Sequence, residues 1–547
     1  MNQTQQFTGY DYKLLNKHLN AINDQELKII FDRNLISLEF VQNNNIQRLQ
    51  LQNCLNIVPK FESSTINYLY IDNCNIKSVE QLKLENVEVL ILSRNQLNSI
   101  QRLTQFSQLK QLDISQNECK DISFLKDLVQ LTHLNVSRNG ILDISVLKQL
   151  INLKELDISE NNKIQKLTPL YYLVKLTKLN IYHIRDCDQK LNTHFLKFLV
   201  NVEELDLLCS KTPDFKSLQY LVKLTKLSIC GSNLKNINFL KYLTRLKDLD
   251  VSNNSVFDMT PIQYLVQLRK LNISYSTFTN IKFLKNLVNL EYLNISYNTN
   301  INIQPLQYLV NLTHLMLDDC EIKDLSVIKY LVQLQSLNIS NRHTMYSQSQ
   351  SKSNLKDISK LQYLVNLKIL DLSGNNQIDI TPLQYLIQLT TLYLSFCGLH
   401  EISALRPLNN LEQLYLDNNN IIKLYPVSQY NENTLLKLAN NKITLTEANM
   451  LTSSLTQFLG EQQIPSQEEL QNANKMNIIA IGIQSIRKVH QAYKVFQFVN
   501  SEMLNKSSSS MLKLISDQQQ FMKNVVSLFQ QLNNISDLVK QTNSDLQ

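Results

Sequence analysis

The sequence has few glycines and no glycine-rich loop. Its 547 residues include 7 glycines, 9 prolines and no tryptophan, whereas a phosphate-cradling loop needs clustered glycines. The 8 histidines are scattered, so neither a Ser-His-Asp triad nor a metal site can be assembled from them. We therefore expect no enzyme activity, no cofactor and no metal.

The cysteines form no CxxC pair and no cluster with histidine. Five occupy repeated apolar or turn positions: Cys54, Cys74, Cys119, Cys320 and Cys397. Thiols so placed are typical of small buried residues in a reducing compartment, rather than of disulfides or metal ligands.

Long apolar runs and dense charged runs are also absent. The longest apolar runs, such as residues 478–483, are too short to cross a bilayer. Residues 1–20 alternate polar and charged groups where a signal peptide needs a continuous apolar core. The net charge of +7 is a weak basic bias without a Lys/Arg cluster. We expect a cytoplasmic protein without a transmembrane segment.

The sequence does contain a repeated motif of 22 residues, which is clearest at 366–387, NLKILDLSGNNQIDITPLQYLI. Leu367, Leu370 and Leu372 have the spacing that buries one face of a short strand. Asn375 then stands where the chain must turn, and its amide can satisfy backbone groups of adjacent turns. A second inward row should follow, at Ile378, Ile380 and Leu383. Thr381-Pro382 indicates the cap and first position of a short helix or 3₁₀ turn.

The pattern resembles the leucine-rich repeat family, L-x-x-L-x-L-x-x-N/C-x-L. The second strand leucine recurs eighteen times, at Leu49, Leu69, Leu90, Leu112, Leu134, Leu156, Leu179, Leu205, Leu227, Leu249, Leu271, Leu293, Leu315, Leu337, Leu370, Leu392, Leu414 and Leu436. The resemblance implies an α/β solenoid, a horseshoe or arc with a parallel sheet on its concave face and short helical or 3₁₀ return legs. Most steps are 22 residues long, which is similar to the internalin type and to the regulatory subunits of protein phosphatase 1.

The ends of the chain depart from the repeat. We expect a helical N-terminal cap over 1–45, in which Asn23 to Glu26 would open a helical turn, and about 18 repeats over 46–445. A cap helix and linker should follow over 446–465. Residues 466–547 then show apolar stripes at helical spacing, which predict two amphipathic helices in a hairpin or coiled coil. These helices either pack within the chain or mediate self-association.

Two of the intervals between successive strand leucines are longer than the others. Four extra residues lie between Leu179 and Leu205, and eleven between Leu337 and Leu370 around 342–354. The second insertion is rich in Ser, Gln and Lys, cannot bury an apolar face, and should loop out. It is either a neutral insertion or a regulatory or binding loop.

An acidic row precedes many return legs, at Asp121, Asp143, Asp258, Asp324, Asp357, Asp379 and Glu401. A carboxylate suits a turn cap or a helix N-terminus. We interpret this row as structural.

Function should lie on the outward strand positions, because the leucine rows are core. Successive parallel strands about 4.8 Å apart would give a ribbon on the order of 80 Å long, which is the size of a protein-binding surface. Its acidic members are Asp113, Glu155, Asp157, Glu160, Glu204, Asp206, Asp248 and Asp250, with Arg138, Lys178 and Lys226 between them. The middle of the ribbon should then be acidic, should prefer basic or mixed-charge proteins, and should repel nucleic acid. Alternatively, these residues merely suit the repeat.

Two aromatic groups are the better candidates for binding anchors, because exposed aromatic rings on a rigid sheet bury large areas at little entropic cost. The first comprises Tyr275, Tyr292, Tyr297 and His314. The second comprises Tyr393, Phe396 and Tyr415.

The sequence therefore predicts a non-catalytic scaffold that binds partner proteins on the concave face. A phosphatase-regulatory subunit is the alternative that the resemblance implies. A surface adhesin is a third interpretation, which predicts an export signal.

Overall fold

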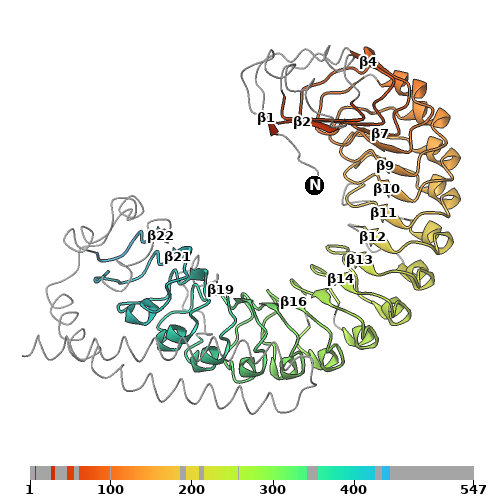
Figure 1. Cartoon of the computed structure of the whole chain (residues 1–547). Helices are drawn as coiled ribbons and strands as arrows, with labels where there is room; N and C mark the ends of the chain where they lie inside the picture. The colour runs from red at the N-terminus through yellow and green to blue at the C-terminus, as the bar shows by residue number, and fades with distance from the viewer. Residues whose placement is uncertain are drawn as a thin grey trace, which may run out of the picture. The chain divides into compact units, whose positions relative to one another are not determined.

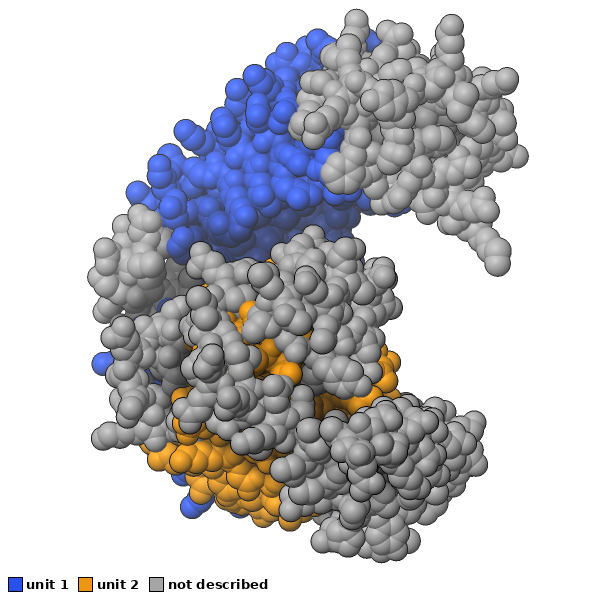
Figure 2. All heavy atoms as spheres, turned by 90° about the vertical axis from the view of Figure 1, so that its left-hand side faces the viewer, with its two compact units in different colours: residues 1–298 blue, residues 299–547 orange. Residues whose placement is uncertain are grey.

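The structure is a computed structural model that describes residues 6–7, 26–30, 46–54, 61–98, 100–184, 192–207, 215–256, 258–276, 278–341, 355–424 and 434–443. These residues belong to two compact units, 1–298 and 299–547, which Figure 2 colours separately. In each unit, short parallel strands form one face and 3₁₀ turns form the opposite face (Figure 1). The predicted solenoid fold is confirmed.

The sheet of unit 1 adds one strand per repeat. Its strands are β1 (Gln6–Phe7), β2 (Glu26–Ile30), β3 (Arg48–Gln52), β5 (Tyr68–Asp72), β7 (Val89–Ile91), β8 (Gln111–Asp113), β9 (His133–Asn135), β10 (Glu155–Asp157), β11 (Lys178–Asn180), β12 (Glu204–Asp206), β13 (Lys226–Ser228), β14 (Asp248–Asp250), β15 (Lys270–Asn272) and β16 (Tyr292–Asn294). Each pairs in parallel with the next of this series. A separate two-stranded sheet pairs β4 (Phe61–Ser63) with β6 (Leu82–Leu84).

Unit 2 repeats the arrangement. Its strands are β17 (His314–Met316), β18 (Ser336–Asn338), β19 (Ile369–Asp371), β20 (Thr391–Tyr393), β21 (Gln413–Tyr415) and β22 (Leu435–Lys437), each parallel to the next.

The predicted leucines set the register within each unit. Leu156, for example, pairs with Leu134 on one side and with Leu179 on the other, and all three are at most 2% exposed. A buried leucine contributes about 1.5–3 kcal/mol relative to an exposed one, and a slip by one residue would turn every leucine outward. The two long steps leave this register intact, because Leu179 pairs with Leu205 and Leu337 with Leu370.

The return legs are 3₁₀ turns. In unit 1 they are η2 (Gln101–Gln105), η3 (Ser123–Asp127), η4 (Ser145–Gln149), η5 (Thr168–Tyr172), η6 (His194–Phe198), η7 (Phe215–Tyr220), η8 (Asn238–Tyr242), η9 (Thr260–Tyr264) and η10 (Lys282–Asn286). In unit 2 they are η11 (Gln304–Tyr308), η12 (Ile328–Tyr330), η13 (Ser359–Tyr363), η14 (Thr381–Tyr385) and η15 (Ser403–Leu405). The expected second inward row is buried, with Ile378, Ile380 and Leu383 at most 6% exposed.

The asparagine ladder links each repeat to the one before it. The Nδ2 of Asn161 donates to the carbonyl oxygens of Val136 and Ile158, and its Oδ1 accepts from the backbone N–H groups of Asn139 and Ile141. Asn161 is fully buried, so these bonds satisfy backbone groups that water cannot reach. Asn375 makes the predicted donor contacts to Ile339 and Leu372 in unit 2.

The acidic row before the return legs caps the turns, as expected. Asp121 Oδ1 accepts the backbone N–H of Ser123 at 2.8 Å, and Glu401 Oε1 accepts that of Ser403 at 2.8 Å. The predicted cap at Thr381 is wrong, however. Thr381 is the first residue of η14, after Ile380 at the N-cap, and gives its N–H to Asp379 Oδ1 at 2.9 Å, so the side-chain acceptor at this turn is the carboxylate two residues earlier.

The prediction of a helix around residues 26–30 is also wrong. Glu26–Ile30 is strand β2, which pairs with β3 residue by residue, Leu27 against Leu49 and Ile29 against Leu51. Pairing with the exposed edge of β3 supplies a full set of backbone hydrogen bonds, and the helix-start pattern does not outweigh them. The sheet therefore begins before residue 46. The rest of the predicted N-terminal cap lies outside the described residues.

Several predictions fall outside the described residues. These are the insertions at 185–190 and 342–354, the cap helix and linker over 446–465, and the amphipathic tail over 466–547.

Candidate functional site

The sheet of unit 1 presents one outward side chain per strand in a first row. From β8 to β16 the row contains Gln111, His133, Glu155, Lys178, Glu204, Lys226, Asp248, Lys270 and Tyr292. From Glu155 to Lys270 the charges alternate in sign at every strand, and the strand register places each beside the next. We call these six residues the charge ladder.

Two neighbouring pairs of the first row lie close together. Lys178 Nζ lies 3.4 Å from Glu204 Oε2, and His133 Nε2 lies 3.6 Å from Glu155 Oε1. Both pairs are substantially exposed, so they contribute little to stability. The prediction of an acidic ribbon is therefore wrong for this row. It omitted Lys270 and did not compare charges strand by strand, although the alternation is visible in the sequence at the L-x-x-L spacing.

The second outward row lies two residues after the first and alternates Asp with Asn or Ser. Its members are Asp113, Asn135, Asp157, Asn180, Asp206, Ser228, Asp250 and Asn272. Asn135, Asn180 and Asn272 each donate from Nδ2 to the Asp of the preceding strand, at 3.2, 3.0 and 2.9 Å. Oδ1 of Asp113, Asp157 and Asp250 accepts the N–H two residues on. These aspartates therefore link the ends of neighbouring strands, which favours the alternative that they merely suit the repeat.

Burial changes the ionisation of two members of the second row. Desolvation raises the pKa of Asp113 above the usual aspartate value, against the hydrogen bonds from Ser115 and Asn135, which lower it. Desolvation also raises the pKa of Asp206, and the charges of Asp250 and Asp157 add to this effect. Oδ1 of Asp206 is buried and has no hydrogen-bond partner in the described part of the chain. Among the described residues of this row, Asp206 is the carboxylate whose buried oxygen lacks a hydrogen-bond partner.

The two rows line a shallow hollow of about 380 Å³ across β8 to β13. The predicted residues Asp113, Glu155, Asp157, Glu204 and Asp206 line it together, whereas Asp248 and Asp250 do not. Lys178 and Lys226 line it as well. The hollow is open, and its five carboxylates outnumber its two lysines, in line with the predicted acidic middle of the ribbon. Its open shape suits a protein surface better than an enclosed small molecule.

A tyrosine pair follows the charge ladder. Tyr275 and Tyr297 stack with ring centroids 3.9 Å apart and planes 13° from parallel, and Tyr275 is 53% exposed. Both have left-handed backbone, with φ of 51° and 59°. Asn53, Asn73 and Asn253 have the same conformation, and asparagine tolerates it far better than a bulky side chain does. Tyr292, the third member of the predicted group, belongs to the first row of β16.

Unit 2 holds the remaining predicted aromatic residues. Tyr393 and Tyr415 stack across β20 and β21 at 4.5 Å and 18°, and Phe396 again has left-handed backbone, with φ of 60°. His314 begins β17 and shares a hydrogen bond of 2.9 Å between its Nδ1 and Thr313 Oγ1. The first row of this unit carries no Asp, Glu, Lys or Arg from β17 to β22: His314, Ser336, Ile369, Thr391, Gln413 and Leu435.

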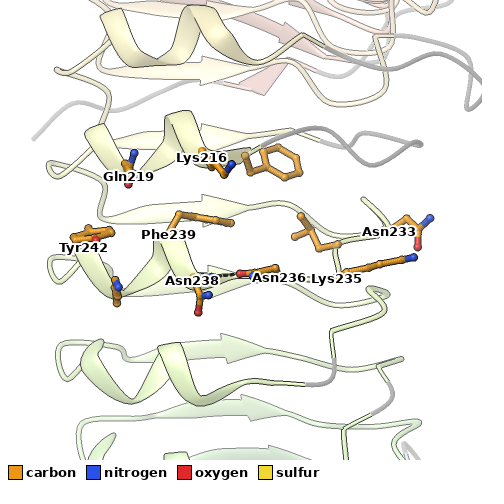
Figure 3. Close-up of a pocket in the computed structure, with 11 residues that line it drawn as sticks. Lys216, Gln219, Asn233, Lys235, Asn236, Asn238, Phe239 and Tyr242 are labelled. Atoms are coloured by element: carbon orange, nitrogen blue, oxygen red, sulfur yellow. Dashed lines mark hydrogen bonds between the residues drawn. The ribbon is translucent and has the colours of Figure 1, made fainter.

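Sequence reasoning missed a groove between η7 and η8, of about 460 Å³ (Figure 3). Phe239 lies between the two turns, and Lys216, Lys235 and Lys241 are the charged residues of its lining. The ring of Phe239 lies 6.2 Å from that of Phe215. The groove is open and basic, and no carboxylate lines it.

The five predicted cysteines are buried free thiols. Burial raises the pKa of Cys119 and of Cys397 to about 12. Across the ranges that the structure describes, no three His, Cys, Asp or Glu side chains are placed to share a metal ion. The same ranges contain no helix with the length and apolar character needed to cross a bilayer.

A sequence model described as "Leucine Rich repeats (2 copies)" matches residues 129–172 and 387–429. The matched stretches contain β9 to η5 in unit 1 and β20 to β21 in unit 2. In these two stretches the chain matches the leucine-rich repeat family, and the resemblance predicted from the sequence is confirmed.

Solved structures of leucine-rich repeat proteins share the fold. The structure of TLR13 in complex with ssRNA13 is 21% identical, with a TM-score of 0.50 over 80% of this chain and 78% of that chain. An internalin (inlF) from Listeria monocytogenes is 22% identical, with a TM-score of 0.47 over 65% of this chain and 89% of that chain. A leucine-rich repeat protein of Leptospira interrogans is 20% identical, with a TM-score of 0.48 over 84% and 100%. A search of curated protein sequences found no match.

Proposed function

We propose that this leucine-rich repeat protein is a non-catalytic scaffold that binds a partner protein on the sheet face of unit 1. The tyrosine pair would be the apolar anchor, and the charge ladder would select a partner of mixed surface charge. The observation that carries the proposal is the stack of Tyr275 and Tyr297 on left-handed backbone.

Stability alone does not account for the tyrosine pair. A non-glycine residue in the left-handed region costs roughly 1–2 kcal/mol, and Tyr275 leaves half of its surface exposed to water. Strained and exposed aromatic residues are characteristic of binding sites, where the strain is part of a preformed surface. Tyrosine is also enriched among the residues that dominate binding energy.

The charge ladder favours a protein over nucleic acid. Charges of like sign recur at every second strand, hence about 9.6 Å apart at the usual strand spacing. A phosphate backbone would meet Glu155, Glu204 and Asp248 as often as the lysines between them, and its uniform negative charge would gain nothing. A protein surface can place acidic and basic groups against the ladder in turn, which gives specificity and register.

Unit 2 would contribute a more apolar contact. Tyr393 and Tyr415 stack in its second row, Phe396 lies at the left-handed position of the same repeat as Tyr393, and its first row lacks acidic and basic residues over β17 to β22. Aromatic pairs of this kind bury large areas at small entropic cost.

Affinity capture from native cell extract, read by mass spectrometry, tests the proposal. Two sheet-face variants are compared with wild type: Tyr275→Asn/Tyr297→Asn, and Lys226→Glu, which would make positions 204, 226 and 248 uniformly acidic. The matched control, Tyr220→Asn/Tyr264→Asn, removes two tyrosines that are as exposed as Tyr275 from the turn side of unit 1.

The expected result is a protein that the wild type and the turn-side control retain and that both sheet-face variants lose. Loss of an anchor worth about 2 kcal/mol weakens binding roughly 30-fold. If all four proteins captured the same set, or if RNA were the species lost, the proposal would be wrong. No described residue favours the phosphatase-regulatory or the adhesin alternative.

A further inference from the structure

The turn side of unit 1 carries a row of exposed aromatic residues that the sheet-face proposal does not use. The last residue of each of five successive 3₁₀ turns, η5 to η9, is an aromatic residue that is 45–58% exposed: Tyr172, Phe198, Tyr220, Tyr242 and Tyr264. The repeat does not require a ring at this position, which holds Asp127 in η3, Gln149 in η4 and Asn286 in η10. The five rings are therefore a feature of this part of the surface.

A row of exposed aliphatic side chains lies two residues after the aromatic row. Its members are 45–52% exposed: Ile151, Val174, Val200, Val222, Val266 and Val288. The turns η4 to η10 stack in order, each against the next, so the two rows run side by side along unit 1 (Figure 1). Single exposed apolar residues are ordinary, but a continuous apolar patch marks an interaction site.

The same turns are strongly basic. The turns η4 to η10, each taken with the three residues after it, contain no Asp or Glu and nine basic residues: Lys148, Lys175, Lys197, Lys216, Lys223, Lys241, Arg245, Lys282 and Lys285. Lys175 Nζ and Lys223 Nζ donate to Asn152 Oδ1 and Asn201 Oδ1 at 2.8 and 2.7 Å, and these neutral acceptors do not cancel the charge. We call the two apolar rows and these nine basic residues the turn face. Its ligand must combine negative charge with apolar contact.

The chemistry of the turn face is less suited to a protein or a nucleic acid. Eight of its nine basic residues are lysines, and lysine is depleted in protein interfaces, where arginine is enriched. Single-stranded nucleic acid stacks its bases on ring faces. Lys197 Nζ and Lys241 Nζ already lie over the rings of Phe198 and Tyr242, 4.9 and 5.0 Å from the centroids. The aliphatic row offers nothing to a phosphate backbone.

A lipid surface uses all three kinds of residue. Tyrosine lies preferentially at the boundary between lipid headgroups and acyl chains, with its ring in the apolar part and its hydroxyl in water. Lysine stems can lie along apolar surface while the ammonium groups reach lipid phosphates. The regular recurrence of ring, aliphatic residue and lysine along the turns also suits a uniform surface better than a partner with one fixed shape.

We propose that the turn face of unit 1 binds the surface of membranes that contain anionic lipids. The rings and the aliphatic side chains enter the headgroup region, and the basic residues contact the anionic headgroups. Each lysine or arginine held near such a surface strengthens binding roughly five-fold. The sheet face, on the opposite side of the unit, stays open, so a bound partner protein would be held at the membrane.

Flotation of the full-length protein with lipid vesicles tests the proposal. Vesicles of phosphatidylcholine alone are compared with vesicles of phosphatidylcholine and phosphatidylserine. The charge variant is Lys216→Gln/Lys223→Gln/Lys241→Gln. Its matched control, Lys178→Gln/Lys226→Gln/Lys270→Gln, removes the same three charges from the charge ladder on the sheet face.

Two further variants test the rings. Tyr220→Asn/Tyr264→Asn removes two rings from the turn face, and Tyr275→Asn/Tyr297→Asn removes two from the sheet face. Circular dichroism of each variant shows whether it unfolds at the same temperature as wild type, which separates loss of binding from loss of the fold.

Wild type is expected to float with the phosphatidylserine vesicles alone, and less so as salt rises. The charge variant should bind about 100-fold more weakly, at roughly five-fold for each lysine. The turn-face ring variant should bind several-fold more weakly, while both sheet-face controls bind as wild type does.

A fluorescent reporter tests whether the rings enter the lipid. The chain has no tryptophan, so Tyr264→Trp supplies a single indole on the turn face, and Tyr275→Trp supplies one on the sheet face. Emission from position 264 should shift to shorter wavelength on phosphatidylserine vesicles, because the indole leaves water. Emission from position 275 should not change.

Four results would overturn the proposal. The first is no flotation of wild type with phosphatidylserine vesicles. The second is equal weakening by the turn-face and the sheet-face variants. The third is an unchanged emission from position 264 in the bound protein. The fourth is binding to polyuridylate or to polyglutamate without binding to vesicles, which would assign the turn face to a nucleic acid or to an acidic protein.

Discussion

The rings of Tyr275 and Tyr297 stack 3.9 Å apart, one repeat from each other, and both residues have positive φ. The same left-handed position holds asparagine in some repeats, as at Asn253 and Asn418, and other polar side chains elsewhere, as at Arg94, Gln116 and Glu160. An aromatic pair at this position is therefore not a requirement of the repeat.

Tyr275→Asn is expected to change the free energy of unfolding by less than about 0.5 kcal/mol. Relief of left-handed strain gains roughly 1 kcal/mol, and loss of the stack costs about as much, so the two effects offset each other. Urea unfolding of the wild type, of Tyr275→Asn and of Tyr275→Phe, which keeps the stack, measures the change in the free energy of unfolding. A destabilisation above about 2 kcal/mol would assign the pair to stability rather than to binding.

Asn161→Ala is expected to destabilise unit 1 by roughly 2–4 kcal/mol. It leaves the buried N–H groups of Asn139 and Ile141 without an acceptor, and each such group costs about 1–3 kcal/mol. The control is Asn152→Ala, whose exposed side chain donates to Val129 O. Hydrogen exchange should accelerate at β9 and β10 in the first variant alone. Equal effects of the two substitutions would contradict the role given to the ladder.

Asp206→Asn is expected to stabilise the protein at pH 7. Desolvation raises the pKa of Asp206 in the folded state, so the folded state binds the proton more tightly, and stability falls as pH rises through the interval between the unfolded and folded pKa values. The advantage of the variant should therefore shrink as pH falls to the usual aspartate value, and vanish below it. Urea unfolding at several pH values checks this, and an advantage independent of pH would contradict it.

Cys119 and Cys397 are expected to resist alkylation in the native protein at pH 8. Burial raises the pKa of each thiol to about 12, so the reactive thiolate is scarce and shielded. Cys230, which is only partly buried, is the reference in the same chain. Mass spectrometry after iodoacetamide should find Cys230 labelled first, and all three labelled in urea. Rapid native labelling of Cys119 would show that unit 1 opens readily.

Much of the fold follows from the sequence because the same leucine and asparagine pattern recurs in successive repeats. The spacing of Leu156, Leu179 and Leu205 sets strand positions and register even across an insertion, and Asn161 identifies the ladder. Glu26–Ile30 escaped this reasoning although Leu27 lies 22 residues before Leu49, one repeat step away, and pairs with it. The helix-start pattern at residues 23–26 was weighed alone, and it carries no information about that pairing.

The candidate site was only partly predictable. The outward positions follow from the leucine period, and residues Asp113 to Asp206 do line one hollow. The charge pattern of the surface did not follow from the number of acidic residues alone. It depends on which charge lies beside which, as at Lys178 and Glu204, and on hydrogen bonds such as that from Asn180 to Asp157. The left-handed backbone of Tyr275 carries no signature that one repeat alone reveals.

Site-specific photo-crosslinking in native cells tests the central claim most directly. A photoreactive amino acid replaces Asn253, the exposed left-handed residue one repeat before Tyr275, or Gln267, an exposed residue on the turn side of unit 1. The account predicts that position 253 crosslinks a partner protein, that position 267 does not, and that Tyr275→Asn/Tyr297→Asn abolishes the crosslink. A crosslink to the same protein from position 267 alone would contradict binding on the sheet face.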